Sequence, residues 1–514
     1  MADKLFAAID VGSFEMAMKI YEISSKKGMK EIEHVRHRLA LGSDSYNSGK
    51  ISFSKIDDLC DVLRKFSDIM ASYHVTEYKA YGTSALRETE NTLIIRDQIR
   101  NRTGIDVEVL SNSEQRFLDY KSVASRGAVF NRIIEQGTAI VDIGGGSIQI
   151  SLFEKDTLVT TQSLRLGVLR LNDQVEHMRI VRDKRREQLD EMIQSQLGTF
   201  RKLYMKDREI TNLIIVDDYV SRVMQSGVVP TSGDCIASSH DFMEFVSELS
   251  ERGREELADK LEVPEEMVDY IEVSANIIRN IIESSGAVNI WAPGVTLCDG
   301  IAYEYAEKCK LKMIAHDFEK DILASAINIS KRYMGSKKRA ETISSIALEL
   351  FDAMQSVHGM GTRERFLLQL ASILHDCGKF INMTNVGECS YNIIMNTEMI
   401  GLSHDERQIV AYVVKFNHEP FAYYGEISST SSLGRSEYLV IAKLTAILRI
   451  AGGLDKSHKD KMRKIKATLQ DDKLVINFTG VQDIGYEKES FNKKAALFGE
   501  VFSIEPVIVQ KKGE

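Results

Sequence analysis

Two short segments of the chain, around positions 10 and 142, share one pattern in which an apolar run ends in Asp, an apolar residue and Gly. The first reads FAAIDVGS from residue 6, and the second reads TAIVDIGGGS from residue 138. Alternating apolar residues follow each segment, so each is predicted to be a β-hairpin with its bend at the glycines. Two such hairpins about 130 residues apart predict two related halves that face one cleft, each contributing one loop.

Both loops have a composition that suits the binding of phosphate groups. Glycine adopts positive φ without cost and lets backbone N–H groups approach a ligand closely. An aspartate at the end of a strand beside such a loop could hold a metal ion or its waters. The same residues could instead serve the fold alone, because turns use glycine freely and aspartate caps turns. The candidate phosphate-binding residues are Gly12, Ser13, Gly144, Gly145, Gly146 and Ser147, and the candidate metal ligands are Asp10 and Asp142.

The chain has 514 residues, which is long enough for three or four domains. Its formal net charge is -9, and no domain is conspicuously basic, so a nucleic-acid partner is not expected. The six cysteines are scattered without a CxxC pair, which favours reduced cytosolic thiols. No apolar run approaches the length of a membrane span, and the N-terminus has no signal-peptide pattern. We therefore expect a cytoplasmic protein with no membrane association.

Four further stretches, together with the two loops, carry a resemblance to a known family. They read GTSALR from residue 82, VEVLSNSEQ from residue 107, LRLGVLRL from residue 164 and LFGEVF from residue 497. In this order they resemble the exopolyphosphatase and guanosine pentaphosphate phosphohydrolase (Ppx/GppA) family. That family is a branch of the superfamily that also holds actin, the sugar kinases and the heat-shock chaperone ATPases. The similarity spans nearly the whole chain.

The resemblance implies an α/β two-lobed actin-like ATPase (ASKHA) fold, a homodimer, Mg²⁺ as cofactor, and polyphosphate or a guanosine nucleotide as ligand. It also implies that Arg87 neutralises phosphate charge, through a fork of donors that suits phosphate oxygens. We place lobe I at residues 1–130 and lobe II at residues 131–308. The apolar patterns predict strands at Leu5–Val11, Met16–Ile23, Tyr78–Gly82, Val107–Leu110, Leu213–Val216 and Val288–Trp291, and helices near Ile56–His74, Leu93–Thr103, Ser113–Ala128 and after Pro264.

From about Asp317 the pattern becomes helical, and we place a separate all-α domain at residues 309–462. The stretch that ends in His375 and Asp376 resembles the signature of the HD phosphohydrolases, and Asp455 resembles the distant aspartate of such a site. Neighbouring His and Asp at a helix end, with a later Asp, can chelate a divalent ion. A small α/β cap follows at residues 463–514, with strands predicted at Ala467–Leu469, Leu474–Phe478 and Phe502–Gln510.

This HD-like site departs from the complete metal-binding pattern. The positions of two expected histidines fall at or near Arg339 and at Cys389. A cation at a ligand position opposes metal binding. His418 could still contribute a ligand, but we expect a structural, metal-free HD-like domain, and a second divalent metal is doubtful.

The cleft itself also departs from the family. Two glutamates direct the attacking water in the resembling family, and their positions here are Gln115 and Gln149. An amide orients water but cannot accept a proton near neutral pH. Three alternatives stay open: Glu114 acts if the register shifts by one residue, Glu15 supplies a carboxylate, or Gln115 only positions water as a glutamine does in small GTPases.

Other residues of the predicted cleft also depart from the family pattern. Asp217 and Asp218 stand where the family has a Ser-Gly-Thr loop, Cys298 stands where the family has an arginine, and Phe14 narrows the first phosphate seat. Two acids near phosphates repel them unless a cation intervenes.

Two hypotheses follow from the cleft residues. In the first, the chain is a divergent phosphoanhydride hydrolase of polyphosphate or guanosine pentaphosphate, with Glu114, Gln115 and Gln149 as the candidate water-directing residues. In the second, it is a non-catalytic relative that closes on a nucleotide or polyphosphate to regulate a partner. The family favours the first hypothesis, and the replaced glutamates favour the second.

Overall fold

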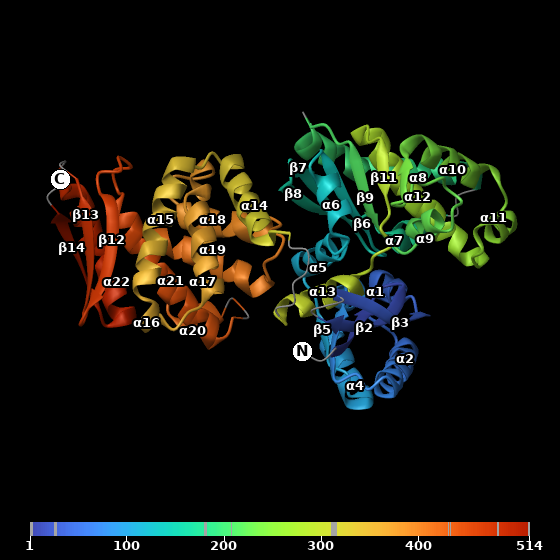
Figure 1. The fold of residues 1–514 in the computed structure, drawn as a ribbon, viewed down its shortest axis with the longest axis horizontal. Coiled ribbons are helices and arrows are strands. Elements are labelled where there is room, and N and C mark those ends of the chain that lie inside the picture. The colour runs from blue at the N-terminus through green and yellow to red at the C-terminus, as the bar shows by residue number, and fades with distance from the viewer. Residues whose placement is uncertain are drawn as a thin grey trace. The chain divides into compact units, whose positions relative to one another are not determined.

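The computed structural model describes residues 4–24, 28–178, 182–206, 208–309, 316–429, 431, 433–480 and 483–511. The chain divides into two compact units, Met1–Phe318 (unit 1) and Glu319–Glu514 (unit 2). Unit 1 contains two mixed α/β lobes, and unit 2 contains a helical bundle with a small sheet (Figure 1).

Lobe I is built on a five-stranded sheet of order β3-β2-β1-β4-β5. The predicted N-terminal hairpin is confirmed, because β1 and β2 pair antiparallel, while β4 and β5 join the sheet in parallel. The strands are β1 (Lys4–Val11), β2 (Glu15–Ser24), β3 (Gly28–Arg38), β4 (Glu77–Gly82) and β5 (Val107–Val109), and the helices are α1 (Leu41–Ser48), α2 (Phe53–Ser72), α3 (Ser84–Glu88), α4 (Thr92–Thr103), α5 (Asn112–Ala124) and α6 (Ala128–Ile134).

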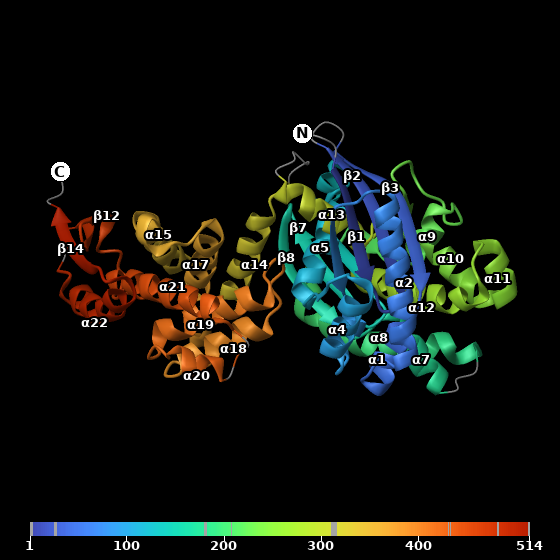
Figure 2. The same ribbon diagram turned by 90° about the horizontal axis from the view of Figure 1, so that it is seen from below.

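Both faces of this sheet are covered, as its parallel strands require. Ala7, Ile9 and Val11 of β1 pack in the core that α2 and α4 complete, and Figure 2 shows α2 lying along the sheet. The alternate residues Phe6 and Ala8 pack on the other face, against the helix α13 (Leu297–Lys308). The sequence placed α13 in lobe II (131–308), but this helix packs against the sheet of lobe I.

Lobe II is built on a six-stranded sheet of order β10-β11-β9-β6-β7-β8. The second predicted hairpin is confirmed by the antiparallel pair β6 and β7, and β9 joins β6 in parallel. The strands are β6 (Thr138–Ile143), β7 (Ile148–Glu154), β8 (Thr157–Leu164), β9 (Asn212–Val216), β10 (Ile236–Ser238) and β11 (Asn289–Trp291), and the helical segments are α7 (Val168–His177), α8 (Arg182–Phe200), the π-helix η1 (Arg201–Met205), α9 (Val220–Gln225), α10 (Ser239–Glu251), α11 (Arg254–Leu261) and α12 (Glu265–Ser285).

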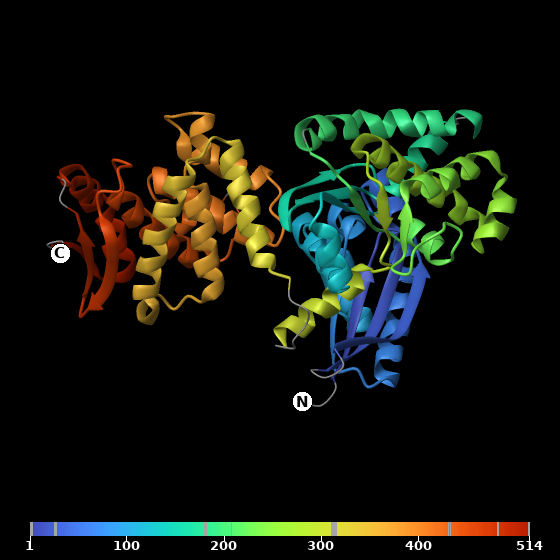
Figure 3. The same cartoon turned by 45° about the horizontal axis from the view of Figure 1, so that its top comes forward.

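Unit 2 combines a helical bundle with the three-stranded sheet β12-β13-β14. The strands, drawn in red, lie beside α22 at one end of this unit (Figure 3). Its elements are α14 (Phe318–Arg332, whose first residue belongs to unit 1), α15 (Lys337–Ala353), α16 (Gln355–His358), α17 (Thr362–Leu374), the 3-10 helix η2 (Cys377–Phe380), α18 (Val386–Asn396), α19 (His404–His418), α20 (Tyr424–Ser428), α21 (Arg435–Leu454), β12 (Arg463–Gln470), β13 (Lys473–Thr479), α22 (Gly485–Phe502) and β14 (Glu505–Lys511).

Several predicted elements have other bounds in the structure, for example the strand Ala467–Leu469, which is β12 (Arg463–Gln470), and in two of them a residue with positive φ lies at the difference. The predicted helix 113–128 is two helices, because Gly127 at φ 60° turns the chain between α5 and α6. The predicted strand 502–510 begins three residues later, since Phe502 ends α22 and Ser503 adopts a left-handed φ of 54°. In both places a single left-handed residue sets the boundary.

Candidate functional site

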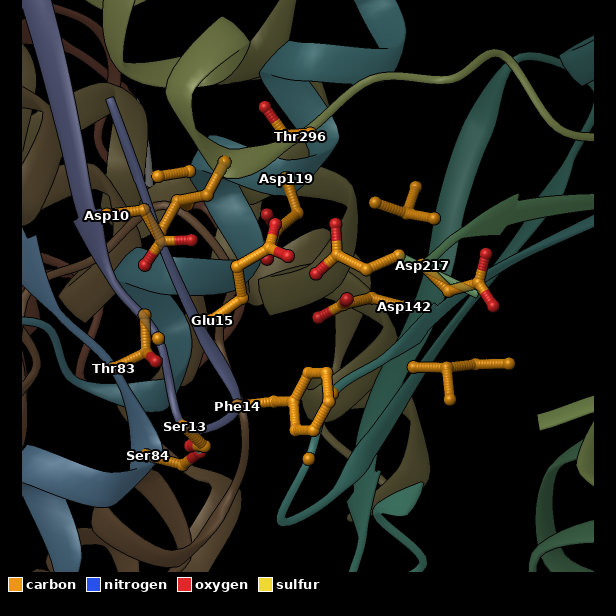
Figure 4. Close-up of a pocket in the computed structure, with 18 of the residues that line it drawn as sticks. Asp10, Ser13, Phe14, Glu15, Thr83, Ser84, Asp119, Asp142, Asp217 and Thr296 are labelled. Atoms are coloured by element: carbon orange, nitrogen blue, oxygen red, sulfur yellow. The ribbon is translucent and has the colours of Figure 1, made fainter. Parts of the chain in front are cut away.

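The two hairpin loops of unit 1 face one cavity, as their matching patterns predict. Asp10 lies opposite Ala17 in the β1–β2 pair, and Asp142 lies opposite Gln149 in the β6–β7 pair. Figure 4 shows carboxylates from both lobes converging in this cavity. Among the residues predicted from the sequence, the cavity is lined by Asp10, Gly12, Ser13, Gln115, Asp142, Gly144 and Gly145.

The glycine-rich loop is held by the start of α7. The N–H groups of Val168 and Leu169 donate to the carbonyls of Gly144 and Gly145, both at 3.0 Å. The structure corrects the reason for glycine here, since none of the three loop glycines has positive φ. They are needed for space instead: a Cβ on Gly145 would lie 3.2 Å from the Ser13 Cβ of the other lobe. The two loops are therefore in close contact.

Three hydroxyl groups meet beside the first loop. Ser13 Oγ lies 2.7 Å from the hydroxyls of Tyr46 and Ser84, and these two lie 2.8 Å apart. The guanidinium of Arg170 lies 4.7 Å from the Tyr46 ring centre, and its Nε donates to the Gly146 carbonyl at 3.0 Å. Tyr46 and Arg170 were not singled out from the sequence, because α1 carries no apolar pattern that would have placed Tyr46 at the loop.

Three carboxyl groups that line the cavity each have one buried oxygen. Asp10 and Asp142 come from the strand ends, and Asp119 comes from α5. One oxygen of each has no hydrogen-bond partner among the described residues: Asp10 Oδ1, Asp119 Oδ2 and Asp142 Oδ2. Burial raises the pKa of Asp142 to about 7. Burial, together with the charges of Asp142 and Asp10, raises the pKa of Asp119 well above its usual range.

The carboxyls of Asp119 and Asp142 influence each other, because the charge of Asp142 raises the pKa of Asp119. Neighbouring carboxyls in an interior do not readily ionise together, so a bound cation would favour their charged forms.

The remaining carboxylates of the cavity are already partnered. Glu15 lies 3.3 Å from Arg36, and Asp218 lies 3.9 Å from the same guanidinium. Asp217 accepts the N–H groups of the first residues of α9, at 2.8 and 2.7 Å, and the hydroxyl of Ser274 at 2.8 Å. Asp217 is therefore a helix cap as well as a lining residue.

Several predicted site residues do not line the cavity. Glu114 forms a capping box with Ser111, in which its carboxylate accepts the Ser111 N–H at 2.9 Å. Arg87 donates to the Leu110 carbonyl at 2.8 Å and to Gln115 Oε1 at 3.3 Å. The cap explains why the shifted register that would bring Glu114 into the cleft does not occur. Gln149, Gly146 and Ser147 also lie outside the lining, and Gln149 is buried with no partner for its Oε1 in the described part of the chain.

Sequence reasoning missed Asp119. The residue follows Gln115 by four positions on a predicted helix, so the two side chains had to share one helix face. This spacing was available in the sequence. It was overlooked because the resemblance drew attention to the residue at position 115 alone.

The predicted HD-like cluster of unit 2 is assembled around an arginine. His375 Nε2 lies 3.2 Å from Asp376 Oδ2, and Arg339 Nη1 lies 3.4 Å from the same oxygen. His418 Nε2 lies 2.6 Å from the His375 carbonyl. Asp455 instead accepts the N–H of Asp460 at 3.3 Å.

The charges around Asp376 make this cluster an ion-pair network. Burial opposes ionisation of Asp376, but the hydrogen bond and charge of His375, with the charge of Arg339, hold its pKa far below the usual range. Burial lowers the pKa of His418 to about 4. Within the described residues, no group of three or more His, Cys, Asp or Glu side chains is arranged to hold a metal ion in either unit.

No helix in the described part of the chain is long and apolar enough to cross a membrane.

Comparisons with known proteins agree with this architecture. The curated relatives include the guanosine-5'-triphosphate,3'-diphosphate pyrophosphatase of Photobacterium profundum, which is 22% identical over 474 residues covering 86% of each chain. The same enzyme of Vibrio cholerae is 21% identical and covers 93% of each chain.

Among solved structures, an exopolyphosphatase from Cytophaga hutchinsonii superposes with a TM-score of 0.52 at 22% identity, over 59% of this chain and 98% of its own. An Aquifex aeolicus Ppx/GppA family member superposes with a TM-score of 0.50 at 17% identity, over 60% of this chain and 99% of its own. The Ppx/GppA phosphatase family profile matches residues 19–307, and the profile of its domain III matches residues 323–490. The chain belongs to the Ppx/GppA phosphatase family.

Proposed function

We propose that the chain hydrolyses a terminal phosphoanhydride bond of inorganic polyphosphate or guanosine pentaphosphate. One observation carries the proposal: carboxylates from two matching hairpins, each with a buried unpartnered oxygen, line one cavity together with a glycine-rich loop. The named relatives act on guanosine pentaphosphate or are exopolyphosphatases, which supports a phosphoanhydride of this kind as substrate.

The glycine loop offers donors for a phosphate group. Within the described residues, the N–H of Gly145 makes no hydrogen bond, while its carbonyl is taken by α7. A free backbone donor at the cavity wall can bind a phosphoryl oxygen. Ser13 offers a hydroxyl from the facing loop, and its Oγ already accepts the Ala85 N–H at 3.1 Å.

The carboxylates require a cation before a polyanion can enter. Asp10 and Asp142 each present a buried oxygen without a partner, and oxygen donors of this kind suit Mg²⁺, which binds through one or two carboxylates and keeps several waters. When bound, Mg²⁺ would supply positive charge to the phosphoryl oxygens. Arg36 is a further positive group at the wall, between Glu15 and Asp218. We therefore propose Asp10 and Asp142 as the residues that hold Mg²⁺.

Phosphate release from long-chain polyphosphate and from guanosine pentaphosphate, with and without Mg²⁺, tests the proposal. We expect turnover of one of the two substrates only with Mg²⁺. The Asp142→Ala variant, purified in parallel, should lose at least about 100-fold and excludes a contaminating phosphatase. Turnover that persists in this variant would contradict the proposal.

A second candidate, a non-catalytic binding protein, is favoured by the amides at Gln115 and Gln149. The double variant Gln115→Glu, Gln149→Glu separates the two. Turnover that starts only after this change, with substrate binding by the unmodified protein, would establish the second candidate. The homodimer expected from the resemblance is a separate proposal, and light scattering coupled to size-exclusion chromatography tests it.

A further inference from the structure

Asp119 reaches the cavity from a helix that contributes no loop to it. Gln115 and Asp119 are four residues apart on α5, which places both side chains on one helix face, about 6 Å apart along the axis. Both line the cavity, and Figure 4 shows the Asp119 carboxylate pointing toward Glu15, Asp142 and Asp217. A carboxylate thus stands one helical turn beyond an amide that cannot accept a proton.

The other carboxylates near the cavity are committed to structural partners. Glu15 pairs with Arg36, Asp217 caps α9, and Glu114 caps α5. The side chain of Asp218 is 50% exposed and faces Arg36 from the rim.

Asp119 differs from these groups in burial and in its unused oxygen. The residue is only 4% exposed. Its Oδ2 has no hydrogen-bond partner among the described residues. Asp10 and Asp142 lie on the two hairpins that face the phosphates, so Asp119 is the buried carboxylate left to contact a water.

We infer that Asp119 is a catalytic residue that orients the attacking water and takes its proton, in the role that neither Gln115 nor Gln149 can fill. The inference rests on the proposed hydrolase function. The water oxygen forms a bond to the terminal phosphorus while the bridging P–O bond breaks, and its electron pair leaves with the shortened chain. The water proton moves to Asp119 Oδ2 and then to the released phosphate.

The first test compares full-length wild type with Asp119→Asn on the substrate that wild type turns over. We expect kcat to fall by about 10²- to 10⁴-fold, the range for loss of a general base, with KM changed by less than about threefold. Asp61→Asn is the matched control, because Asp61 lies on α2 with its side chain 58% exposed and pairs with Arg64. Its kcat should equal that of wild type.

The second test moves the carboxylate back by one turn. Adding Gln115→Glu to Asp119→Asn should raise kcat at least tenfold, because the longer glutamate projects from the same helix face toward the same water. A purely structural role of Asp119 would not be rescued in this way. If Asp119→Asn does not fold, Asp119→Glu replaces it, and the misplaced carboxylate should lower kcat at least tenfold.

The results distinguish failure of the proposed hydrolase function from failure of the role of Asp119. No turnover by wild type overturns both the proposed function and the role of Asp119. Turnover by wild type that stays within threefold in the folded Asp119 variant overturns the role of Asp119 and leaves the hydrolase function standing.

Discussion

Gly167 lies where the glycine-rich loop passes closest to the start of α7. A Cβ at this position would lie 2.2 Å from the Gly146 carbonyl carbon and 2.3 Å from the Gly145 carbonyl oxygen. Both atoms belong to the backbone, so neither can rotate away. We expect Gly167→Ala to displace the phosphate loop, to destabilise unit 1 by about 1–3 kcal/mol as overpacking does, and to reduce phosphate release more than tenfold.

Gly198 provides the control for this substitution. It lies in α8, and a Cβ there meets no atom within 4 Å. Alanine favours a helix interior over glycine by about 1 kcal/mol, so Gly198→Ala should keep full activity and slightly raise the melting temperature. Equal melting temperatures and rates for the two variants would contradict the close approach at Gly167.

Asp142 should make the stability of the cation-free protein depend on pH. Burial raises its pKa to about 7 in the folded state, above the ordinary value of 3.8, so the native state binds the proton more tightly. Stability therefore rises as pH falls through 7 and levels off below about 4. We expect the melting temperature of wild type, relative to Asp142→Asn, to increase by at least about 2 °C between pH 8 and pH 5.

Thermal unfolding of both proteins in chelator at pH 8, 7, 6 and 5 checks this expectation. The comparison with the variant removes the contributions of other titrating groups, such as His418, whose lowered pKa acts in the opposite direction. Parallel curves for the two proteins would show that Asp142 titrates normally.

At the scale of single residues, the sequence predicted the positions that repeat between the two halves. Asp10 and Asp142 were found because the two loops match, and both line the cavity. The capping box of Ser111 and Glu114 and the shared helix face of Gln115 and Asp119 follow from spacings in the sequence. The sequence could not show that this face of α5 is turned into the cavity, since that depends on helix packing. The positive φ expected for the loop glycines was wrong, and the close contact between the lobes that they permit is not visible in a single segment.

At the scale of helices, Asp376 holds the end of α17 against the start of α15. It lies 3.4 Å from Arg339, 3.2 Å from His375 and 2.8 Å from Lys379, and its side chain is 12% exposed. Removing one member of a buried ion pair leaves the other charges uncompensated. We expect Asp376→Asn to lower the free energy of unfolding of unit 2 by about 3–5 kcal/mol in urea.

The surface pair of Asp352 with Arg365 is the matched control. It has two short contacts, at 2.7 and 2.8 Å, but its side chains are 53% and 39% exposed. Exposed pairs contribute about 0–1 kcal/mol, so Asp352→Asn should change little. Similar losses in the two variants would show that burial of the Asp376 network contributes nothing.

Elements with an apolar face were predicted, and polar elements were missed. Both hairpins and the helix after Pro264 are confirmed. The edge strand β3 has the sequence GMKEIEHVRHR and contains no fully buried residue, so no alternation marked it. The short helix α1 is also polar, so no apolar pattern marked it in the sequence. Their positions depend on the neighbouring β2 and on the first loop, which lie elsewhere in the sequence.

At the scale of the whole chain, unit 1 and unit 2 have separate cores. The buried clusters of residues 6–306 hold the two lobes and the cavity, and none of their members lies beyond residue 318. The residues that line the cavity all belong to unit 1. Unit 2 contributes the domain III that the family profile recognises.

This separation predicts that a fragment of residues 1–318 folds and keeps the activity of the full chain. The last residues of unit 1 pack against α5. The ring centre of Phe318 lies 5.1 Å from that of Tyr120 and 5.4 Å from that of Phe117. His316 Nε2 lies 2.6 Å from the Tyr120 hydroxyl. These contacts hold α5, the helix that carries Gln115 and Asp119. A fragment of residues 1–309 lacks them, so it should melt several degrees lower and release phosphate more slowly than 1–318. Equal melting temperatures and rates for the two fragments would mean that α5 is positioned by lobe I and α13 alone.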